Sequence, residues 1–458
     1  MSSVAQPSPD SAKEGRRAAA PDVLVLGAGL GGLAAALELA RKGWRVTIVE
    51  REAPPWHRLG ESFDWETPVL LARLGFDLEQ LRRQDVLTVK PGVIIWCNTR
   101  HPSNEAWLLP PESYMRMIRR SHRTYHGNRS RLDSLILDEA LRAGCRLREG
   151  RVRKVHMRGS RVESVELGDG RRLRAAFYID AGGRSRLVTR SCGVQQRLQG
   201  EHSVCLWRRH RHHYDEKGTR LYLLDQGTNL IWIWNIHVDS RTTDIGMVIP
   251  AACYRSLAAN GAGSGEESAA GVKDAEDVYW DVVADVDLLK EFADRSRVAG
   301  PLQTCSFRQY VSDQAAGENW LGVGETAFLV DPISSAGVTV ALRSAKFASQ
   351  ILDDALGGGQ AVLPQRDRRF YHKRLSHQVA FVNTTLQMLY SSRRLWNRIG
   401  VPVYVRLLVL PQFQINWLSS CFALRSRAGL VLIAFLRHFL GGGVRVFLSS
   451  LRLVFRSS

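Results

Sequence analysis

The chain has 458 residues, a hydrophobic fraction of 45% and a formal net charge of +18 at pH 7. This length and composition are typical of a globular protein with a sizeable core and several domain-sized units. Its seven cysteines include no CxxC pair, which indicates reduced thiols in a cytoplasm and no metal site. No nucleic-acid-binding motif accompanies the charge, so we expect a membrane surface or an acidic protein partner instead.

The first 20 residues are polar and contain prolines but no apolar stretch. They predict a disordered N-terminus, and neither a signal peptide nor a membrane anchor.

Residues 22–50 predict a buried strand, a glycine-rich turn, a helix and a second strand. Gly27 permits the tight turn, Gly29 lets the backbone approach a pyrophosphate, and Gly32 allows close packing of helix and strand. Glu50 ends the second strand, about 20 residues further on, where an acid hydrogen-bonds a ribose. The segment therefore predicts a dinucleotide-binding unit whose helix N-terminus faces the phosphates.

The remaining elements follow in alternating order. Helical patterns occur at 66–84, 128–142 and 338–356. Strand patterns occur at 86–97, 146–155, 161–167, 172–178 and 320–330, and residues 204–249 are β-rich. We expect the strands near Val23, Phe177 and Trp320 to share one sheet, with a β-rich domain inserted between them.

Two further motifs combine a buried strand with glycines and acids. Phe177–Arg184 contains Asp180, and Trp320–Gly337 contains Glu325, Asp331 and Pro332. Together with the first motif, their order resembles the flavoprotein aromatic hydroxylase superfamily.

That resemblance implies FAD as the cofactor and an α/β fold with a Rossmann-like FAD-binding domain, an inserted β-sheet substrate domain and a helical C-terminal region. Glu325, where the family usually has aspartate, would contact the ribityl chain, and Asp331 and Pro332 would lie against the flavin. The helix after Gly337 would point its N-terminus at the flavin. The resemblance further implies that Arg51, Arg129 and Asp180 would contact FAD.

The predicted domains follow from this resemblance. They are a disordered segment at 1–20, an FAD-binding domain at 21–200 and 300–356 with a substrate-side segment at 63–125, a substrate domain at 201–299 with a flexible insertion at 258–277, and a helical region at 357–458.

Four segments resemble flavin-dependent halogenases: Leu59–Ser62, Val89–Trp96, Trp232–Ile236 and Asp331–Gly337. The resemblance implies that FADH₂, delivered by a separate flavin reductase, reacts with O₂ to a C4a-hydroperoxide that oxidises chloride or bromide to hypohalous acid. The N–H groups of Ala336 and Gly337 would hold the halide, and Lys90 would carry the oxidant to the substrate.

The same resemblance bears on the substrate. Trp232 and Trp234 would line the pocket and keep the substrate away from the flavin. Ser334 stands where tryptophan halogenases carry a glutamate, and His237 stands where the signature has proline, so the loop after Trp234 is expected to differ. We therefore expect a phenol-like or pyrrole-like aromatic small molecule, either free or tethered to an acyl or peptidyl carrier protein.

Other interpretations stay open at this point. The enzyme alternatives are a flavin monooxygenase, which would oxygenate its substrate directly, and a reductase related to geranylgeranyl reductases. A non-catalytic flavin-binding or membrane-associated scaffold is the alternative outside enzymes. Lys90 also fits a solvated strand edge, the two tryptophans also fit a core, and Arg208–His213 is interpreted as a solvated surface loop.

The C-terminal region has two interpretations. The apolar run at 428–436 is shorter than the ~20 residues of a spanning helix. Residues 444–456 predict a basic amphipathic helix, which either packs on the substrate domain or contacts a membrane peripherally. We thus expect a cytoplasmic protein, with peripheral membrane contact as the open alternative.

Overall fold

The computed structural model describes residues 20–56, 58–98, 105–108, 124–213, 218–227, 229–259, 273–391 and 400. The expectations for the N-terminal segment and for residues 428–436 and 444–456 lie outside these ranges.

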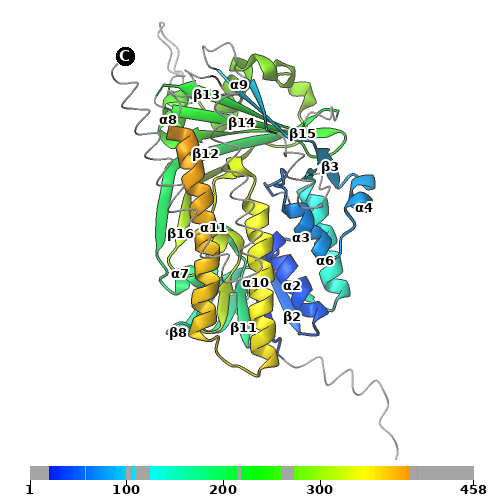
Figure 1. Ribbon diagram of the computed structural model, residues 1–458, viewed down its shortest axis with the longest axis vertical. Helices are drawn as coiled ribbons and strands as arrows, with labels where there is room; N and C mark the ends of the chain where they lie inside the picture. The colour runs from blue at the N-terminus through cyan, green and yellow to red at the C-terminus, as the bar shows by residue number, and fades with distance from the viewer. Residues whose placement is uncertain are drawn as a thin grey trace, which may run out of the picture.

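Short strands, most of them apolar and buried, form a parallel sheet in the lower half of Figure 1. Its strands, in spatial order, are β17 (Trp320–Gly322), β11 (Phe177–Asp180), β1 (Val23–Leu26), β2 (Val46–Glu50) and β7 (Arg146–Glu149). The prediction that the strands near Val23, Phe177 and Trp320 share a sheet is confirmed.

The register of this sheet aligns the carboxyl ends of its central strands. Leu26 pairs with Asp180, and Asp180 pairs with Gly322. The three glycine- and acid-containing motifs, far apart in sequence, therefore leave the sheet at one edge, where open α/β sheets bind their ligands.

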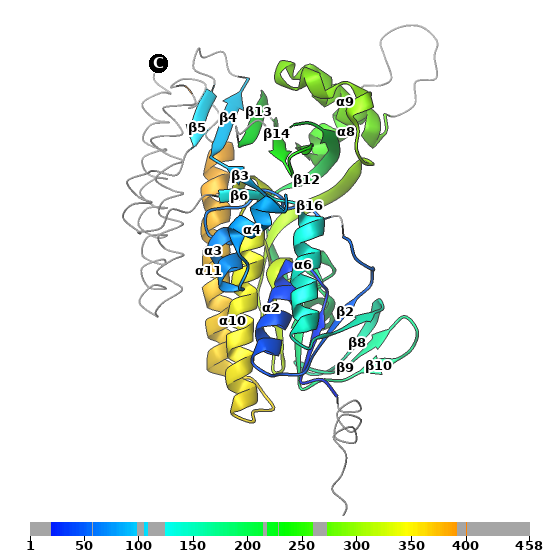
Figure 2. The ribbon, with the colours of Figure 1, turned by 90° about the vertical axis from the view of Figure 1, so that its right-hand side faces the viewer.

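Four helices pack beside this sheet, as both views show (Figures 1 and 2). They are α2 (Leu30–Arg41), α6 (Arg129–Arg142), α10 (Gly337–Gly357) and α11 (Gln365–Ser391). Asn128 caps α6 through its side chain, which accepts from the Arg131 N–H. The apolar faces of these helices and of the sheet form the largest core cluster.

A small antiparallel sheet covers the opposite side of the parallel strands. It consists of β10 (Arg172–Leu173), β9 (Arg161–Leu167) and β8 (Val152–Arg158), and the short α7 (Leu187–Ser191) packs on β8.

The upper half of the molecule is a second large sheet (Figure 1). Its order is β18 (Phe328–Leu329), β16 (Gln303–Ser312), β12 (Gln196–Arg211), β15 (Thr242–Pro250), β14 (Asn229–His237), β13 (Thr219–Gln226), β4 (Val93–Cys97) and β5 (Glu105–Leu108). The range 300–356 was predicted to belong to the FAD-binding domain, but its strands β16 and β18 belong to this second sheet.

The two faces of the large sheet carry separate apolar clusters. One packs against α8 (Ala251–Ala259) and α9 (Ala275–Asp285). The other contains Trp232 and Trp234, together with Leu59 and Ile333 from the loops near the parallel sheet. We call this second side the tryptophan face.

Short elements join the two halves. They are α3 (Thr67–Arg73), α4 (Leu78–Arg83) and the two-stranded sheet of β3 (Leu87–Lys90) and β6 (Thr124–Gly127). Short 3₁₀ helices are η1 (Gly183–Ser185), η2 (Asp287–Phe292), η3 (Arg295–Arg297), η4 (Gly324–Thr326) and η5 (Pro332–Ser334).

Four predicted segments differ in the structure. The helix predicted at 66–84 is two helices, separated at Gly75 with φ +86°. The strand predicted at 86–97 is two strands in different sheets, because Pro91-Gly92 interrupts it. The insertion predicted at 258–277 has helical ends, since α8 reaches Ala259 and α9 begins at Ala275.

The fourth is the basic segment Arg208–His213, which is not a surface loop. Its residues up to Arg211 belong to β12, where Arg208 and His210 are buried. Arg208 pairs with Glu276, Arg209 with Asp244, and His210 contacts Tyr279. Cross-strand and helix partners neutralise this segment, and a sequence window cannot show them.

Within the described ranges, no helix is long and apolar enough to cross a membrane. Those ranges also contain no group of three or more His, Cys, Asp or Glu side chains placed to hold a metal ion.

Candidate functional site

The first part of the site is the glycine turn between β1 and α2. Gly27 has φ +110°, and a Cβ there would lie 2.5 Å from the Ala181 carbonyl oxygen, so both its conformation and its packing require glycine. Gly32 packs directly on Gly27, where a Cβ would overlap the Gly27 carbonyl oxygen. Gly29 caps α2 without a side-chain hydrogen bond, which leaves the helix N-terminus open to a phosphate.

Glu50 and Arg58 complete this turn. Glu50 is buried at the end of β2, and its carboxylate accepts the Ala28 N–H at 2.8 Å and Arg58 Nη2 at 3.0 Å. Arg58 Nη1 also lies 3.7 Å from the position of a Cβ on Gly29. Glu50, the residue predicted to hydrogen-bond the ribose, is therefore paired with Arg58, which the sequence motif does not include. Because Arg58 also lies beside Gly29, it is a candidate contact to the pyrophosphate.

Two predicted FAD contacts serve local structure first. The buried Asp180 carboxylate accepts backbone N–H groups of Gly182 at 3.2 Å and Val188 at 2.7 Å, and burial raises its pKa. Arg129 is buried and pairs with Asp133 at 2.9 Å. By contrast, Arg51 is exposed. The assignment of all three to the cofactor stays a prediction.

Glu325 lies in η4, directly after β17, at the shared edge. Its side chain is about half exposed (49%) and reaches Arg184 at 4.0 Å. Its place at this edge and its exposure are compatible with the predicted contact to a ribityl chain, which stays a prediction.

Asp331 is buried and its carboxylate is fully engaged. It accepts Tyr390 Oη at 2.9 Å, Gln309 Nε2 at 2.6 Å and the Ile333 N–H at 3.1 Å. Burial raises its pKa to about 6. Of the two residues predicted to lie against the flavin, only Pro332 is exposed, and its contact with the flavin stays a prediction.

The N-terminus of α10 follows this turn. Ser335 has φ +55°, and no heavy atom lies within 4 Å of a Cβ built on Gly337. Ala336, the N-cap, lacks a side-chain cap, and its own N–H donates to Ser334 Oγ at 3.3 Å. The Ala336 N–H is thus already engaged by Ser334. The helix N-terminus as a whole suits an anion or the pyrimidine ring of a flavin.

Lys90 ends β3 and is buried, which excludes a solvated strand edge. Its Nζ donates to Ser62 Oγ and to the Phe63 carbonyl oxygen, both at 2.9 Å. Burial lowers the pKa of Lys90 to about 8, against a smaller opposing effect of Asp64.

Ser62 joins Lys90 to the N-terminus of α10. Ser335 Oγ donates to Ser62 Oγ at 3.1 Å. Since Ser62 then accepts from both Lys90 and Ser335, its own proton points to Thr219 Oγ1 at 3.2 Å, which lies 2.7 Å from His126 Nε2. The predicted lysine and the predicted halide loop are therefore neighbours through one hydroxyl.

Trp232 and Trp234 lie on the tryptophan face, with ring centroids 5.6 Å apart. The strand continues through His237, which pairs with Thr243, so the loop expected after Trp234 is absent from this described strand. A proline at position 237 would have no backbone N–H to donate within the sheet, whereas His237 retains this donor.

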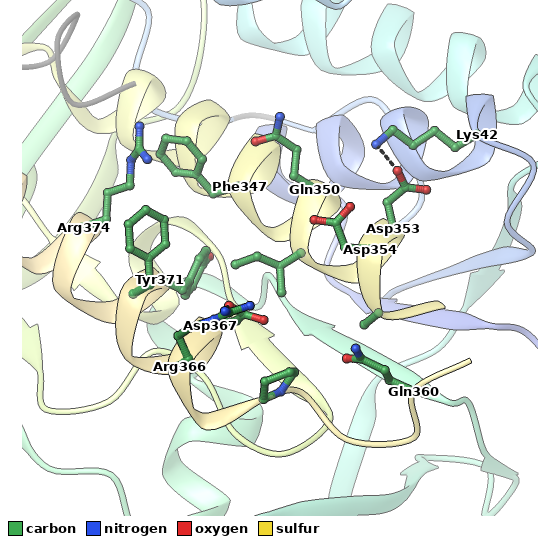
Figure 3. Close-up of a pocket in the computed structure, with 14 residues that line it drawn as sticks. Lys42, Phe347, Gln350, Asp353, Asp354, Gln360, Arg366, Asp367, Tyr371 and Arg374 are labelled. Atoms are coloured by element: carbon green, nitrogen blue, oxygen red, sulfur yellow. Dashed lines mark hydrogen bonds and ion pairs between the residues drawn. The ribbon is translucent and has the colours of Figure 1, made fainter. Parts of the chain in front are cut away.

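A separate pocket lies on the outside of the molecule. It encloses about 590 Å³ between the C-terminal half of α10 and the start of α11, and its lining includes Phe347, Tyr371 and Arg374 (Figure 3). Lys42 and Asp353 form an ion pair at its rim. Gly337 is at the opposite end of α10, so this pocket is not the candidate site.

The fold and the edge site define an FAD-dependent oxidoreductase, since the glycine-capped N-terminus of α2, the acid Glu50 and the N-terminus of α10 fit FAD. A model described as FAD dependent oxidoreductase matches residues 22–70. A model described as Tryptophan halogenase matches residues 96–394. The chain belongs to this halogenase family, within the flavin-dependent halogenases.

Curated relatives agree with this assignment. Tryptophan 2-halogenase of Chondromyces crocatus is 24% identical over 350 residues, which are 73% of this chain and 62% of the relative. The 1H-pyrrole-2-carbonyl-[peptidyl-carrier protein] chlorinase of Pseudomonas fluorescens is 21% identical over 404 residues, which are 83% of this chain and 84% of the relative.

Solved structures show the same fold. The flavin-dependent brominase Bmp2 has a TM-score of 0.74 at 18% identity and covers 93% of this chain and 100% of its own. A variant of the halogenase PltM in complex with FAD has a TM-score of 0.67 at 18% identity, and the match covers 92% of this chain and 84% of the PltM chain.

Proposed function

We propose that this protein halogenates an electron-rich aromatic ring with reduced FAD, O₂ and chloride or bromide. The observation that carries the proposal is the pair of hydrogen bonds from Lys90 and Ser335 to Ser62. They set the buried lysine beside the α10 N-terminus, where Ala336 and Gly337 would hold the halide. Bound reduced FAD would supply, with O₂, the oxidation of halide to hypohalous acid.

Lys90 is suited to capture that oxidant. A protonated lysine has three N–H donors, and two are used by Ser62 and Phe63. The third can donate to hypohalous acid. With a pKa near 8, a substantial fraction of the amine is also neutral at physiological pH and can accept the halogen. Burial keeps water from consuming the oxidant.

The substrate we propose is phenol-like or pyrrole-like. Ser334 has no carboxylate, and its hydroxyl donates to the Asp331 carbonyl oxygen at 2.8 Å, so this residue offers no charge to orient and activate an indole. Such a site suits rings that are already electron-rich. Two relatives act on a pyrrole carried by a peptidyl carrier protein.

A carrier-bound substrate would also suit the net charge of +18. Positive charge speeds association with an acidic carrier protein and makes it sensitive to salt. We propose a separate flavin reductase as the source of FADH₂.

The test is mass spectrometry of reactions that contain the protein, FAD, a flavin reductase, NADH, O₂ and bromide. Phenols, pyrroles, indoles and a pyrrolyl carrier protein are offered in turn. We expect a bromine isotope doublet on a phenol or pyrrole, which is lost in Lys90→Ala and kept in the control Lys42→Ala, at an exposed lysine.

Two outcomes would contradict the proposal. A bromide-independent gain of one oxygen would make the protein a monooxygenase. Full bromination by Lys90→Ala would remove Lys90 from the mechanism.

A further inference from the structure

Two cysteines face each other across neighbouring strands of the large sheet. Cys205 of β12 and Cys305 of β16 are direct partners in the antiparallel register, and both are free thiols. The same row continues through Val248 of β15 to Trp232 of β14. The pair therefore belongs to the tryptophan face: Cys205 is in the apolar cluster that contains Trp232 and Trp234, and Cys305 packs against that cluster.

The strand geometry permits a disulfide between these residues. Directly opposed residues of antiparallel strands have Cα atoms about 4.5–5.5 Å apart. Disulfides span Cα separations of about 4.4–6.8 Å. The Cα spacing expected of Cys205 and Cys305 therefore falls within the range that a disulfide spans.

The two thiols have different surroundings. Cys205 is buried, and burial raises its pKa. Cys305 is partly exposed, and its pKa is lowered, first by a hydrogen bond with Cys205 and then by the positive charge of Arg184. Arg184 is held in place because its Nη1 donates to the carbonyl oxygen of Ser306, the next residue of β16, at 2.9 Å.

This pair lies between the cofactor edge and the substrate face. Arg184 is the last residue of the Asp180 motif and also reaches Glu325, the candidate ribityl contact, at 4.0 Å. Ile333, one residue before Ser334, packs on the cluster that includes Cys205. A peroxide leaving the flavin site would therefore meet Cys305 close to its source.

We propose that Cys305 and Cys205 form a peroxide-reactive pair, in which Cys305 is oxidised and Cys205 resolves it to a disulfide. The Cys305 thiolate attacks one oxygen of hydrogen peroxide, the O–O bond breaks, and hydroxide leaves. The Cys205 thiol then loses its proton and attacks the Cys305 sulfur. The S–S bond forms, the S–O bond breaks, and each hydroxide leaves as water after taking a proton.

The net reaction converts two thiols and one peroxide into a disulfide and two waters. A thiol reductant restores the pair. The pair would remove oxidant before it reaches the indole rings of Trp232 and Trp234, which share its face.

The experiment treats the FAD-loaded full chain with one equivalent of hydrogen peroxide and maps its peptides by mass spectrometry. No halogenation is needed, so the result is independent of the proposed function. We expect a Cys205–Cys305 disulfide that a thiol reductant reverses. In Cys205→Ser, a sulfenic-acid trap should label Cys305, and in Cys305→Ser no disulfide should form at Cys205.

Cys192 is the matched control, because it is also partly exposed while burial raises its pKa to about 11. We expect Cys305 to react at pH 7 at least about ten times faster than Cys192, whose thiolate is scarce. Cys192→Ser should leave the disulfide unchanged. Equal rates for Cys305 and Cys192, or oxidised protein without the Cys205–Cys305 peptide, would overturn the proposal.

Discussion

Lys90 Nζ donates a hydrogen bond to Ser62 Oγ at 2.9 Å inside the protein. The same oxygen accepts Ser335 Oγ at 3.1 Å. Ser62 belongs to the turn before α3, Lys90 ends β3, and Ser335 precedes α10, so one hydroxyl joins three parts of the chain. A change at Ser62 should therefore alter the position of the lysine relative to the α10 N-terminus.

Replacing Ser62 with alanine tests that relationship. Hydrogen bonds to charged groups contribute about 1.5–3 kcal/mol, so we expect Ser62→Ala to lower the halogenation rate about 10- to 100-fold. FAD affinity should change little, since Ser62 is not a predicted cofactor contact. Steady-state rates and flavin titrations measure both effects, with Ser256→Ala, an exposed serine of α8, as the control. A normal rate in Ser62→Ala would show that the lysine does not depend on this hydroxyl.

The stability of the protein should depend on pH through Lys90. Burial lowers its pKa from 10.5 to about 8 in the folded chain. Between these values the unfolded chain holds a proton that the folded chain has lost, so folding stability rises with pH across this window. Methionine at this position does not titrate.

Lys90→Met should therefore gain stability relative to the parent below pH 8, and lose that gain by about pH 10.5. The change across the window should be on the order of 3 kcal/mol. Urea unfolding of both proteins at several pH values measures it, because all other titrating groups are shared. Parallel stability curves for the two proteins would mean that the pKa of Lys90 is not lowered.

The glycine turn and the shared parallel sheet could be predicted because their signals are local. Gly27, Gly29 and Gly32 lie within six positions, and each strand motif carries its own apolar run. The halogenase-like segment Leu59–Ser62 can be recognised in the sequence, but the contact of Ser62 with Lys90 cannot. Ser335 lies 273 residues from Ser62, and only the fold brings them together.

The basic segment of β12 shows why the rest could not be predicted. Its charges suggested solvent, but Arg209 pairs with Asp244, 35 residues away, and Arg208 with Glu276, 68 residues away. The break of the predicted strand at Pro91-Gly92 and the break of the predicted helix near Gly75 have visible causes in the sequence. Their effect depended on which sheet or helix each half joined.

Arg209→Met should destabilise the fold. Arg209 donates to Asp244 through Nε at 2.7 Å and Nη2 at 2.9 Å, and the Asp244 side chain is only 2% exposed. Removing the arginine leaves a buried carboxylate without its charge partner, which costs about 3 kcal/mol or more. Arg211→Met, an exposed arginine of the same strand, should cost less than about 1 kcal/mol. Urea unfolding measures both variants. Equal losses of unfolding free energy in Arg209→Met and Arg211→Met would show that the Arg209–Asp244 ion pair makes no specific contribution to stability.

Gly29→Ala should separate cofactor binding from folding. A Cβ on Gly29 would meet only Arg58 Nη1, at an ordinary contact distance of 3.7 Å, whereas a Cβ on Gly27 would collide with Ala181. We therefore expect Gly29→Ala to fold normally and Gly27→Ala to be strongly destabilised. If the pyrophosphate approaches α2 at Gly29, the added methyl group should raise the dissociation constant of FAD at least tenfold, or about 1.4 kcal/mol.

Titration of FAD fluorescence measures that affinity, and thermal unfolding checks the fold. Gly168→Ala is the control, because the position lies in a surface turn with only the Arg151 carbonyl oxygen within 4 Å. Unchanged affinity in a folded Gly29→Ala protein would place the pyrophosphate elsewhere, with Arg58 as its next candidate partner. Lost affinity together with lost stability would mean that Gly29, like Gly27, is required by the turn itself.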